Sequence, residues 1–157
     1  GWQVWPGSPV SKAGKGTLYY GYPPGKTYAF GYMHAGVAIT KAVKVPTGVK
    51  SSLSFSLYFD TTKSGLYDRL KVWLWLDGQR QYIGTNKNST PSNGSIWYRG
   101  GANNTPKKWY DVVVDTTQYA GKKVQLEFYF NAAKVPAAGS GQGVFVDEVK
   151  FVRACPK

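Results

Sequence analysis

The chain has 157 residues, of which 20 are Lys or Arg and 8 are Asp or Glu, so its formal net charge is +12. This length suits a single domain with a sizeable core, which we expect to span residues 1–157. Strand-forming residues dominate and glutamate occurs only as Glu127 and Glu148, which argues against a helical bundle. No apolar run is long enough to form a membrane-spanning helix, so a membrane protein is not expected.

Aromatic residues crowd the first 35 positions, among many glycines and prolines. The segment 21–25, Gly-Tyr-Pro-Pro-Gly, is a turn signal. We expect residues 1–35 to form a loop-rich arm with one or two short strands, which can cover a face of a sheet built from residues 36–152. Because the chain begins at Gly1 and has one methionine, Met33, we also expect a secreted protein from which any signal peptide has been removed.

Short segments with strand-type alternation follow the arm and are separated by turn signals. They span residues 37–45, 52–59, 70–76, 79–84, 96–99, 108–114, 123–130 and 143–152. The main irregular loops are expected at 85–107 and 131–142. About eight regularly spaced strands without a convincing helix predict an all-β fold, either an antiparallel sandwich or a closed barrel.

Segment 70–76 reads Leu-Lys-Val-Trp-Leu-Trp-Leu and alternates without a break. Successive side chains of a strand point to opposite faces, so the aliphatic residues share one face while Lys71, Trp73 and Trp75 share the other. Two indoles beside a cation suit a flat ligand such as a sugar ring or a base. The alternative is that another part of the chain, above all the aromatic arm, covers the indoles.

Other strands carry similar side chains on the face away from their expected core. Segment 123–130 carries Gln125, Glu127 and Tyr129 there, and segment 52–59 carries Tyr58. If these strands neighbour segment 70–76, the residues form one aromatic and polar platform. Aromatic rings combined with a few polar groups are typical of small-molecule sites, and they suit the apolar face and the hydroxyls of a sugar.

The positive charge is unevenly distributed, because no acidic residue precedes Asp60 whereas six lysines do. Such a field attracts polyanions, although a basic surface can also serve solubility alone. Single-stranded nucleic acid would suit interleaved aromatic and basic residues, but only four arginines and no RNP-type motif are present. Lys71 and its neighbours instead favour a uronate, sulfated or pyruvylated sugar.

Candidate catalytic groups are scarce. His34 would have to act as a base without a recognisable orienting group, and no Gly-x-Ser-x-Gly elbow presents a serine. Cys155 is the single cysteine, so it cannot form a disulfide within the chain. We therefore expect a protein that is not an enzyme.

Structural roles can be assigned to the carboxylates that are predicted to be buried. Asp68 is in phase with Leu70, and Asp147 is in phase with Phe145, so both are predicted to point into the core. A buried carboxylate must be hydrogen-bonded, paired or metal-bound, and we expect hydrogen bonds to backbone, Tyr or Arg. The rival is one structural calcium held by Asp60, Asp68 and Asp147, since calcium takes several oxygen ligands; otherwise no cofactor is expected.

Four stretches of the chain resemble a known family. They are Ser-Phe-Ser-Leu-Tyr-Phe-Asp-Thr at 54–61, ahead of Tyr-Asp at 67–68; Val-Trp-Leu-Trp-Leu-Asp-Gly at 72–78; Trp-Tyr-Asp-Val-Val-Val-Asp at 109–115, leading into Tyr-Ala-Gly-Lys at 119–122; and Gly-Val-Phe-Val-Asp-Glu-Val at 143–149. Over residues 50–152 the chain thereby resembles the jelly-roll domains related to MAM domains and to accessory β-domains of secreted immune-inhibitor-A-type proteases. Many carbohydrate-binding modules share this fold.

The resemblance implies a jelly-roll sandwich and a secreted, non-catalytic module, often attached to a hydrolase. It does not account for Trp73 and Trp75, because domains of this type usually carry small polar residues at those positions. We expect a module that binds carbohydrate, specifically an acidic polysaccharide, as a monomeric part of a larger enzyme. The alternatives are an accessory domain packed on a secreted protease and, further, a binder of single-stranded nucleic acid.

Overall fold

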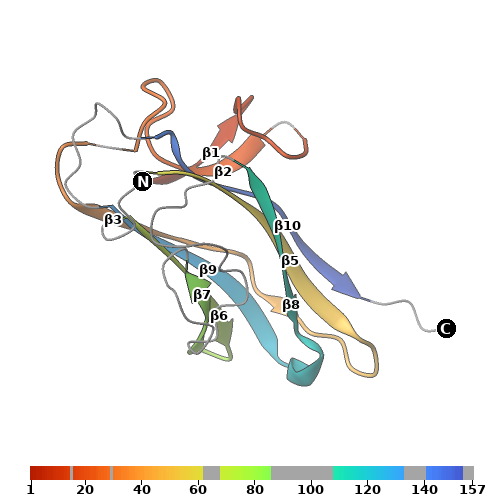
Figure 1. Ribbon diagram of the computed structural model, residues 1–157. Coiled ribbons are helices and arrows are strands. Elements are labelled where there is room, and N and C mark those ends of the chain that lie inside the picture. The colour runs from red at the N-terminus through yellow and green to blue at the C-terminus, as the bar shows by residue number, and fades with distance from the viewer. Residues whose placement is uncertain (15, 29, 62–67, 86–107, 133–140, 154–157) are drawn as a thin grey trace.

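Two antiparallel β-sheets pack face to face in a computed structural model of the protein (Figure 1). The structure describes residues 1–14, 16–28, 30–61, 68–85, 108–132 and 141–153. The strands are β1 (Trp2–Pro6), β2 (Gly16–Tyr20), β3 (His34–Ile39), β4 (Val43–Lys44), β5 (Ser51–Asp60), β6 (Arg69–Leu76), β7 (Gln79–Thr85), β8 (Trp109–Asp115), β9 (Lys123–Ala132) and β10 (Gly143–Arg153), and a short 3-10 turn, η2 (Thr117–Tyr119), follows β8.

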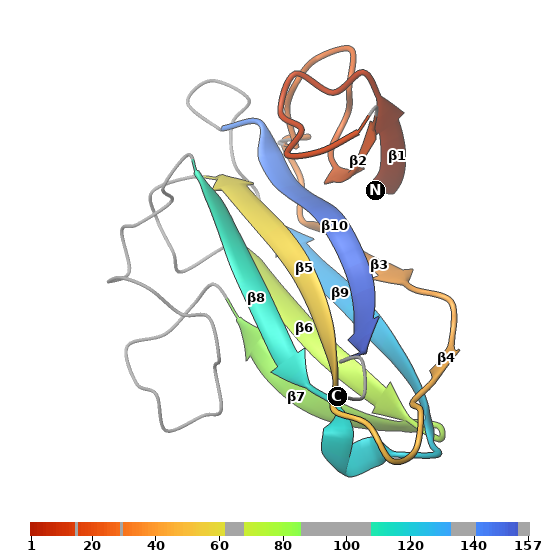
Figure 2. The ribbon, with the colours of Figure 1, turned by 90° about the vertical axis from the view of Figure 1, so that its right-hand side faces the viewer.

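The order of the strands is that of a jelly roll. Sheet 1 has the order β1-β2-β10-β5-β8, and sheet 2 has the order β3-β9-β6-β7, with β4 also pairing with β9. Apart from the β6–β7 hairpin and the β1–β2 hairpin, neighbouring strands within a sheet come from distant parts of the chain, as in two interleaved Greek keys. Figure 2 shows β8, β5 and β10 of sheet 1 in front of β6 and β9 of sheet 2. The prediction of an all-β antiparallel jelly-roll sandwich is confirmed.

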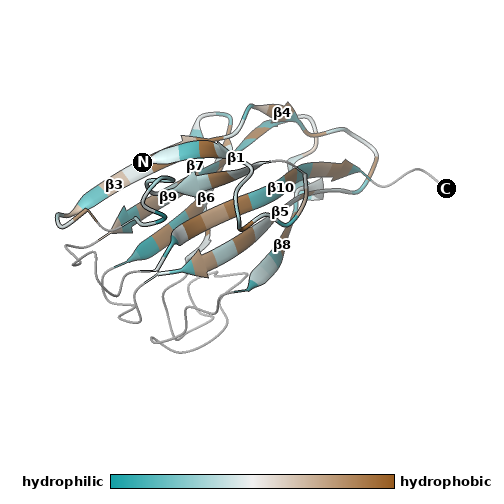
Figure 3. Ribbon diagram, turned by 90° about the horizontal axis from the view of Figure 1, so that it is seen from above, coloured by the Kyte–Doolittle hydropathy of each residue, from teal (hydrophilic) through white to brown (hydrophobic). Residues whose placement is uncertain are grey.

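The core fills the space between the two sheets. Strict alternation in β5, β6 and β9 turns one apolar row of each strand inward, which Figure 3 shows as bands of contrasting hydropathy along the strands. Among the residues with less than 2% exposure are Phe55, Leu57, Leu70, Leu74, Leu126 and Phe128. Each such side chain contributes about 1.5–3 kcal/mol when it leaves water, so these rows dominate the stability of the fold.

The predicted strands match the observed ones with small shifts. Segment 37–45 divides into β3 and β4, and β3 already begins at His34, inside the predicted arm. The arm itself contains the β1–β2 hairpin, and β2 pairs with β10, so these residues extend sheet 1. The predicted strand at 96–99 and Cys155 lie outside the described residues.

The aromatic residues of the arm close one edge of the sandwich. Trp2 lies 5.3 Å from the Tyr20 ring and 6.3 Å from the Phe128 ring, measured between centroids, and donates its indole N–H to the Gly36 carbonyl at 3.1 Å. A Cβ at Gly36 would lie 2.7 Å from Cε2 of Tyr20, so only glycine lets β3 pass this close to the ring. Tyr28 is also fully buried.

The phase of β10 corrects one prediction. Val144 and Val146 point into the core, whereas Phe145 and Asp147 lie on the outer face of sheet 1. The register then shifts between Asp147 and Lys150, and this bulge returns Phe151 to the core side. The sequence was ambiguous because apolar residues occupy both faces of the first half of the strand.

Candidate functional site

The outer face of sheet 2 brings together most of the predicted site residues. Strands β6 and β9 are neighbours, and their register sets Lys71 opposite Tyr129, Trp73 opposite Glu127 and Trp75 opposite Gln125. Both indoles are partly exposed. Strands β1 and β2 of the arm belong to sheet 1, so the arm strands do not form a layer over the two indoles.

Strand β7 adds two residues that the sequence analysis missed, Arg80 and Tyr82. The turn Asp77-Gly78 has positive φ at both residues, 47° and 88°, which is the geometry that Asp-Gly favours in a two-residue hairpin. This turn pairs Leu76 with Gln79, so Arg80 faces Trp75 and Tyr82 faces Trp73. The signal was available, because a two-residue Asp-Gly turn fixes the partners of the following strand. We call Lys71, Trp73, Trp75, Arg80, Tyr82 and Tyr129 the tryptophan face.

Arg80 lies over both indoles. Its guanidinium carbon is 4.8 Å from the centroid of the Trp73 ring and 5.5 Å from that of the Trp75 ring. Both distances lie within the range of cation–π attraction. The Tyr82 ring meets the Trp73 ring edge to face, with centroids 5.0 Å apart. The aromatic groups are therefore held in fixed relative positions by a cation and by each other.

The buried residue Glu127 holds the side chains of Trp75 and Arg80 in place. Its side chain is buried, and the residue is 1% exposed. Its Oε2 accepts the indole N–H of Trp75 at 2.6 Å and the Nε–H of Arg80 at 3.2 Å, while its Oε1 accepts an N–H from the Arg80 Nη2. The strand pattern predicts that Glu127 contacts a ligand. In the structure both of its oxygens bind Trp75 or Arg80, so Glu127 holds these two side chains, and direct contact with a ligand stays a prediction.

The rest of the face is polar at one side and apolar at the other. The Lys71 Nζ lies 6.0 Å from the centroid of the Tyr129 ring. Gln125 donates from its Nε2 to the Thr40 carbonyl at 2.9 Å. On the neighbouring β3, Val37 and Ile39 are 49% and 52% exposed. An apolar border thus continues the aromatic surface toward the edge strand.

The charges of the two outer faces differ. On sheet 2, the cations Arg69, Lys71 and Arg80 surround a buried Glu127 that is already paired. On sheet 1, the outer face carries Asp111, Asp115 and Asp147 together with Lys12 and Lys150, and Lys12 pairs with Asp111. The tryptophan face therefore has a positive local charge that an anionic ligand can use.

Tyr58 does not join the tryptophan face. It lies on β5, which belongs to sheet 1, and its ring is 5.6 Å from the Trp109 ring of β8. Alternation groups Tyr58 with the tryptophans only if their strands neighbour one another, but β5 and β6 lie in opposite sheets. Strand alternation alone cannot distinguish the outer faces of two sheets.

The three predicted calcium ligands do not converge. Asp147 lies outside the core, and its Oδ2 accepts hydrogen bonds from the backbone N–H groups of Lys12 and Ala13, at 2.9 and 3.2 Å. Asp68 is buried and accepts the hydroxyl of Tyr28. Within the described residues, no three His, Cys, Asp or Glu side chains lie close enough to hold a metal ion. Asp147 thus accepts N–H donors and Asp68 accepts an O–H donor in different parts of the structure, and a structural calcium stays a prediction.

His34 is held by hydrogen bonds at both ring nitrogens. Its Nε2 lies 2.8 Å from the Tyr28 carbonyl, and its Nδ1 lies 2.7 Å from the Tyr20 hydroxyl. A carbonyl can only accept, so Nε2 carries the proton and Nδ1 accepts from Tyr20. Burial lowers the pKa of His34, against a smaller opposing effect of the Tyr28 carbonyl. Burial also raises the pKa of Tyr20 to about 12.

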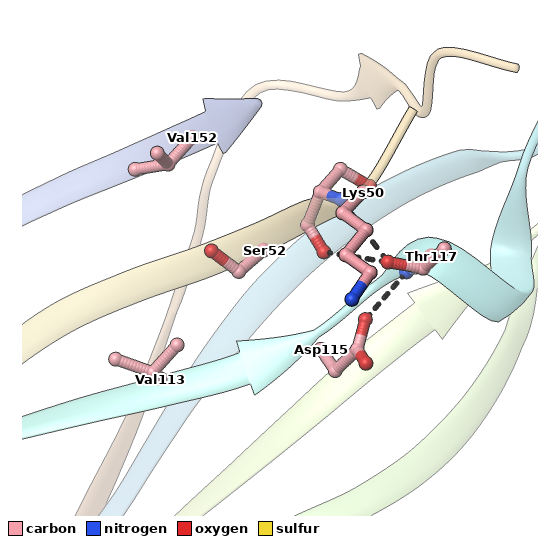
Figure 4. Close-up of a pocket in the computed structure, with 7 residues that line it drawn as sticks. Lys50, Ser52, Val113, Asp115, Thr117 and Val152 are labelled. Atoms are coloured by element: carbon pink, nitrogen blue, oxygen red, sulfur yellow. Dashed lines mark hydrogen bonds between the residues drawn. The ribbon is translucent and has the colours of Figure 1, made fainter. Parts of the chain in front are cut away.

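A shallow hollow lies on the outer face of sheet 1, where β5 begins and β8 ends (Figure 4). It is lined by Lys50, Ser51, Ser52, Val113, Asp115, Thr117 and Val152. Val113 and Val152 are 60% and 47% exposed, and the backbone N–H of Thr117 holds the pKa of Asp115 below its usual value. None of these lining residues is aromatic, so the hollow lacks the stacking surface that the tryptophan face has.

Comparisons with known proteins identify the fold. No protein-family model and no curated protein matches the sequence. The structure of TmCBM61 in complex with beta-1,4-galactotriose matches 98% of this chain and 88% of that chain, with a TM-score of 0.52 and 10% identity. A Family 16 Carbohydrate Binding Module-2 matches 96% of this chain and 84% of that chain, with a TM-score of 0.40 and 16% identity. The likeness to TmCBM61 shows a shared sandwich fold. Within the described residues, no helix is long and apolar enough to span a membrane.

Proposed function

We propose that the protein is a non-catalytic carbohydrate-binding module that binds an anionic polysaccharide on the tryptophan face. The observation that carries the proposal is the pair of partly exposed indoles, Trp73 and Trp75, held in place by Arg80 and by the buried Glu127. A face built this way is fixed before a ligand arrives, so binding does not have to order the aromatic side chains.

The aromatic part of the face suits a sugar ring. Trp73, Trp75, Tyr82 and Tyr129 supply ring surfaces across three neighbouring strands, and the C–H face of a pyranose can lie against such surfaces. Gln125 and Lys71 supply polar groups beside the rings for hydroxyl contacts. The fold supports the same class of ligand, since TmCBM61 is described in complex with beta-1,4-galactotriose.

The basic part of the face favours an acidic sugar. Lys71 is partly exposed and lies beside Tyr129, while Arg80 keeps its side chain 43% exposed despite its bonds to Glu127. A carboxylate or sulfate on a sugar stacked against the rings would meet these cations. Their contribution is screened by salt, so binding should weaken as ionic strength rises.

The proposal includes a setting for this activity. A module with such a face would act outside the cell and hold an attached hydrolase or lyase on its polysaccharide, as one monomeric part of a larger protein. Support comes from the resemblance of residues 50–152 to secreted accessory domains and from the high positive charge of the chain. The resemblance to MAM-like domains stays a prediction.

Affinity electrophoresis tests the proposal. Wild-type protein runs through gels that contain pectin, alginate, a sulfated galactan, a neutral galactan or single-stranded DNA, and retardation reports binding. We expect retardation in at least one acidic polysaccharide, and we expect it to be lost in the variant Trp73→Ala/Trp75→Ala. Lys71→Ala should weaken it by about threefold to tenfold, whereas Lys50→Ala, which removes the same charge from the hollow on sheet 1, should not.

Two results would contradict the proposal. One is the absence of retardation in every polysaccharide gel while near-ultraviolet circular dichroism shows folded protein. The other is retardation by single-stranded DNA alone, which would make the protein a nucleic-acid binder. In either case, the stacking surface would remain but its assigned ligand would be wrong.

An accessory domain that packs on a neighbouring domain is a second candidate, favoured by the exposed Val113 and Val152 at the hollow. Exposed aliphatic side chains of this kind are common in interfaces between domains. This candidate predicts that the double tryptophan variant behaves like the wild type in every gel. It also predicts that Val113→Asp disrupts the parent protein without affecting the isolated chain.

A further inference from the structure

A second set of aromatic side chains crosses the outer face of sheet 1, on the opposite side of the sandwich. Tyr19, Phe145, Tyr58 and Trp109 are directly paired across β2, β10, β5 and β8. Their ring centroids are 4.6, 5.7 and 5.6 Å apart in that order. The rings therefore form one continuous row perpendicular to the strands.

Trp5 of β1 extends the row at its other end. Its ring lies 4.9 Å from the Tyr19 ring and 6.3 Å from the Phe145 ring. Tyr19 and Phe145 are fully buried, whereas Trp5, Tyr58 and Trp109 are partly exposed. The row thus has a buried floor in the middle and exposed aromatic surface at both ends. We call these five residues the aromatic row.

The aromatic row is separate from the cluster of side chains between the two sheets. The inward face of β10 is filled by Val144 and Val146, and that of β5 by Leu57 and Phe59, all of which belong to the cluster between the sheets. The row lies outside that cluster, on the side of the sheet that faces away from sheet 2. Aromatic residues in register on an outer face, with three of five partly exposed, are typical of a binding surface.

The polar groups beside the row point to a neutral ligand. One step further along the strands, Ser56 donates to Oδ1 of Asp111 at 2.7 Å, and the Lys12 ammonium pairs with the same carboxylate. Asp147 lies on the same face and is held by the loop around Lys12. Because Lys12 neutralises the Asp111 carboxylate, the groups beside the rings form no unpaired field of one sign, and hydroxyl, carboxylate and ammonium groups together can bind the hydroxyls of an uncharged sugar.

We propose that the aromatic row is a second carbohydrate-binding site, and that it takes a neutral polysaccharide chain on the face opposite the tryptophan face. Trp109, Tyr58 and Trp5 would contact sugar rings, and Tyr19 and Phe145 would support them from below. The site does not depend on the residues of the tryptophan face, because the two sets lie on opposite sheets.

The test uses gels that contain a neutral polysaccharide: β-1,4-galactan, galactomannan or β-1,3-glucan. We expect at least one of them to retard the wild-type protein and the Trp73→Ala/Trp75→Ala variant alike. Trp109→Ala should weaken that retardation by about tenfold or more, while Trp109→Phe should keep most of it because a ring remains. Val113→Ala is the matched control, since Val113 is exposed on the same strand and outside the row.

The outcomes separate this proposal from the first. If neutral polysaccharides retard the wild type and the double tryptophan variant abolishes the effect, there is a single site and the aromatic row is not one. If no neutral polysaccharide retards the wild type, the row does not bind this class of ligand, whatever the acidic gels show. Because Trp109→Ala can lower stability, Trp5→Ala from the other end of the row gives a second reading, and both variants are checked by urea unfolding.

Discussion

Trp75 donates its indole N–H to Oε2 of Glu127 at 2.6 Å, which ties a partly exposed aromatic ring to a carboxylate that is buried beneath it. Arg80 binds the same carboxylate from above and lies over the ring. A sheet surface that would otherwise hold two freely rotating indoles is thereby fixed. The stability of the fold and the geometry of the tryptophan face should therefore respond together to changes at Glu127.

Replacing Glu127 with Gln should lower the free energy of unfolding by about 2–3 kcal/mol. Glutamine keeps the shape, but its NH₂ group must face a donor of either Trp75 or Arg80, so one bond is lost and the arginine keeps an unpaired charge. Urea unfolding measures this change, and affinity electrophoresis should show weaker binding. Glu148→Gln removes a partly exposed carboxylate that pairs with Lys12 and Lys150, and such a surface pair should contribute little to stability. Equal effects of the two variants would contradict the role of Glu127.

Gly36→Ala should destabilise the protein by about 1–3 kcal/mol through overpacking. The new Cβ would lie 2.7 Å from the Tyr20 ring, and that ring is confined by Trp2 and Phe130. The control is Gly16→Ala on β2, where the nearest atoms are 3.5 Å away or more and no steric penalty arises. Thermal unfolding of both variants is the measurement, and a Gly36→Ala variant as stable as Gly16→Ala would show that Tyr20 can move aside.

Tyr28→Phe should lower the free energy of unfolding by about 1–2 kcal/mol without changing polysaccharide binding. The substitution removes the hydroxyl that Asp68 accepts inside the protein, and it leaves the rings of both outer faces unchanged. Tyr22→Phe, at an exposed ring of the same arm, should have no effect. Denaturant unfolding measures the stability, and gel retardation measures polysaccharide binding. A Tyr28→Phe variant that loses binding would mean that the arm contributes to the site.

The protein should lose stability as the pH falls below about 6.5, in part through His34. Burial holds the pKa of His34 below its ordinary value of 6.5, so the unfolded chain takes up a proton before the folded one does. The stabilising effect is therefore complete above pH 6.5 and declines below it. His34→Gln should flatten this part of the stability profile, which urea unfolding at several pH values records. A profile unchanged by the substitution would assign the loss to other groups.

Much of the fold could be predicted from alternation alone. Strands β5, β6 and β9 carry strict patterns, and their observed bounds differ from the predicted ones by at most two residues. The phase of strand β10 cannot be predicted in this way, because apolar residues fill both of its faces between Gly143 and Val146 and period-two alternation carries no information there. The bulge after Asp147 adds a change of phase that no local pattern encodes.

Only part of the candidate site could be predicted from the sequence. Alternation shows that a side chain points away from a core, and this was sufficient for Trp73 and Trp75. It does not show which of the two sheets a strand joins, so Tyr58 was grouped with the wrong partners. The contacts of Glu127 with Arg80 could not be predicted from alternation either, because they depend on the pairing of β7 with β6.

In the β6–β7 hairpin, packing of the core fixes which residues lie side by side on the outer face. Ile83 of β7 points into the core and is 4% exposed, and one residue before it Tyr82 faces outward against Trp73. A slip of the strand by one position would expel Ile83 into water and turn Tyr82 inward. Selection for a well-packed core would therefore preserve the placement of Arg80 and Tyr82 even without selection for ligand binding.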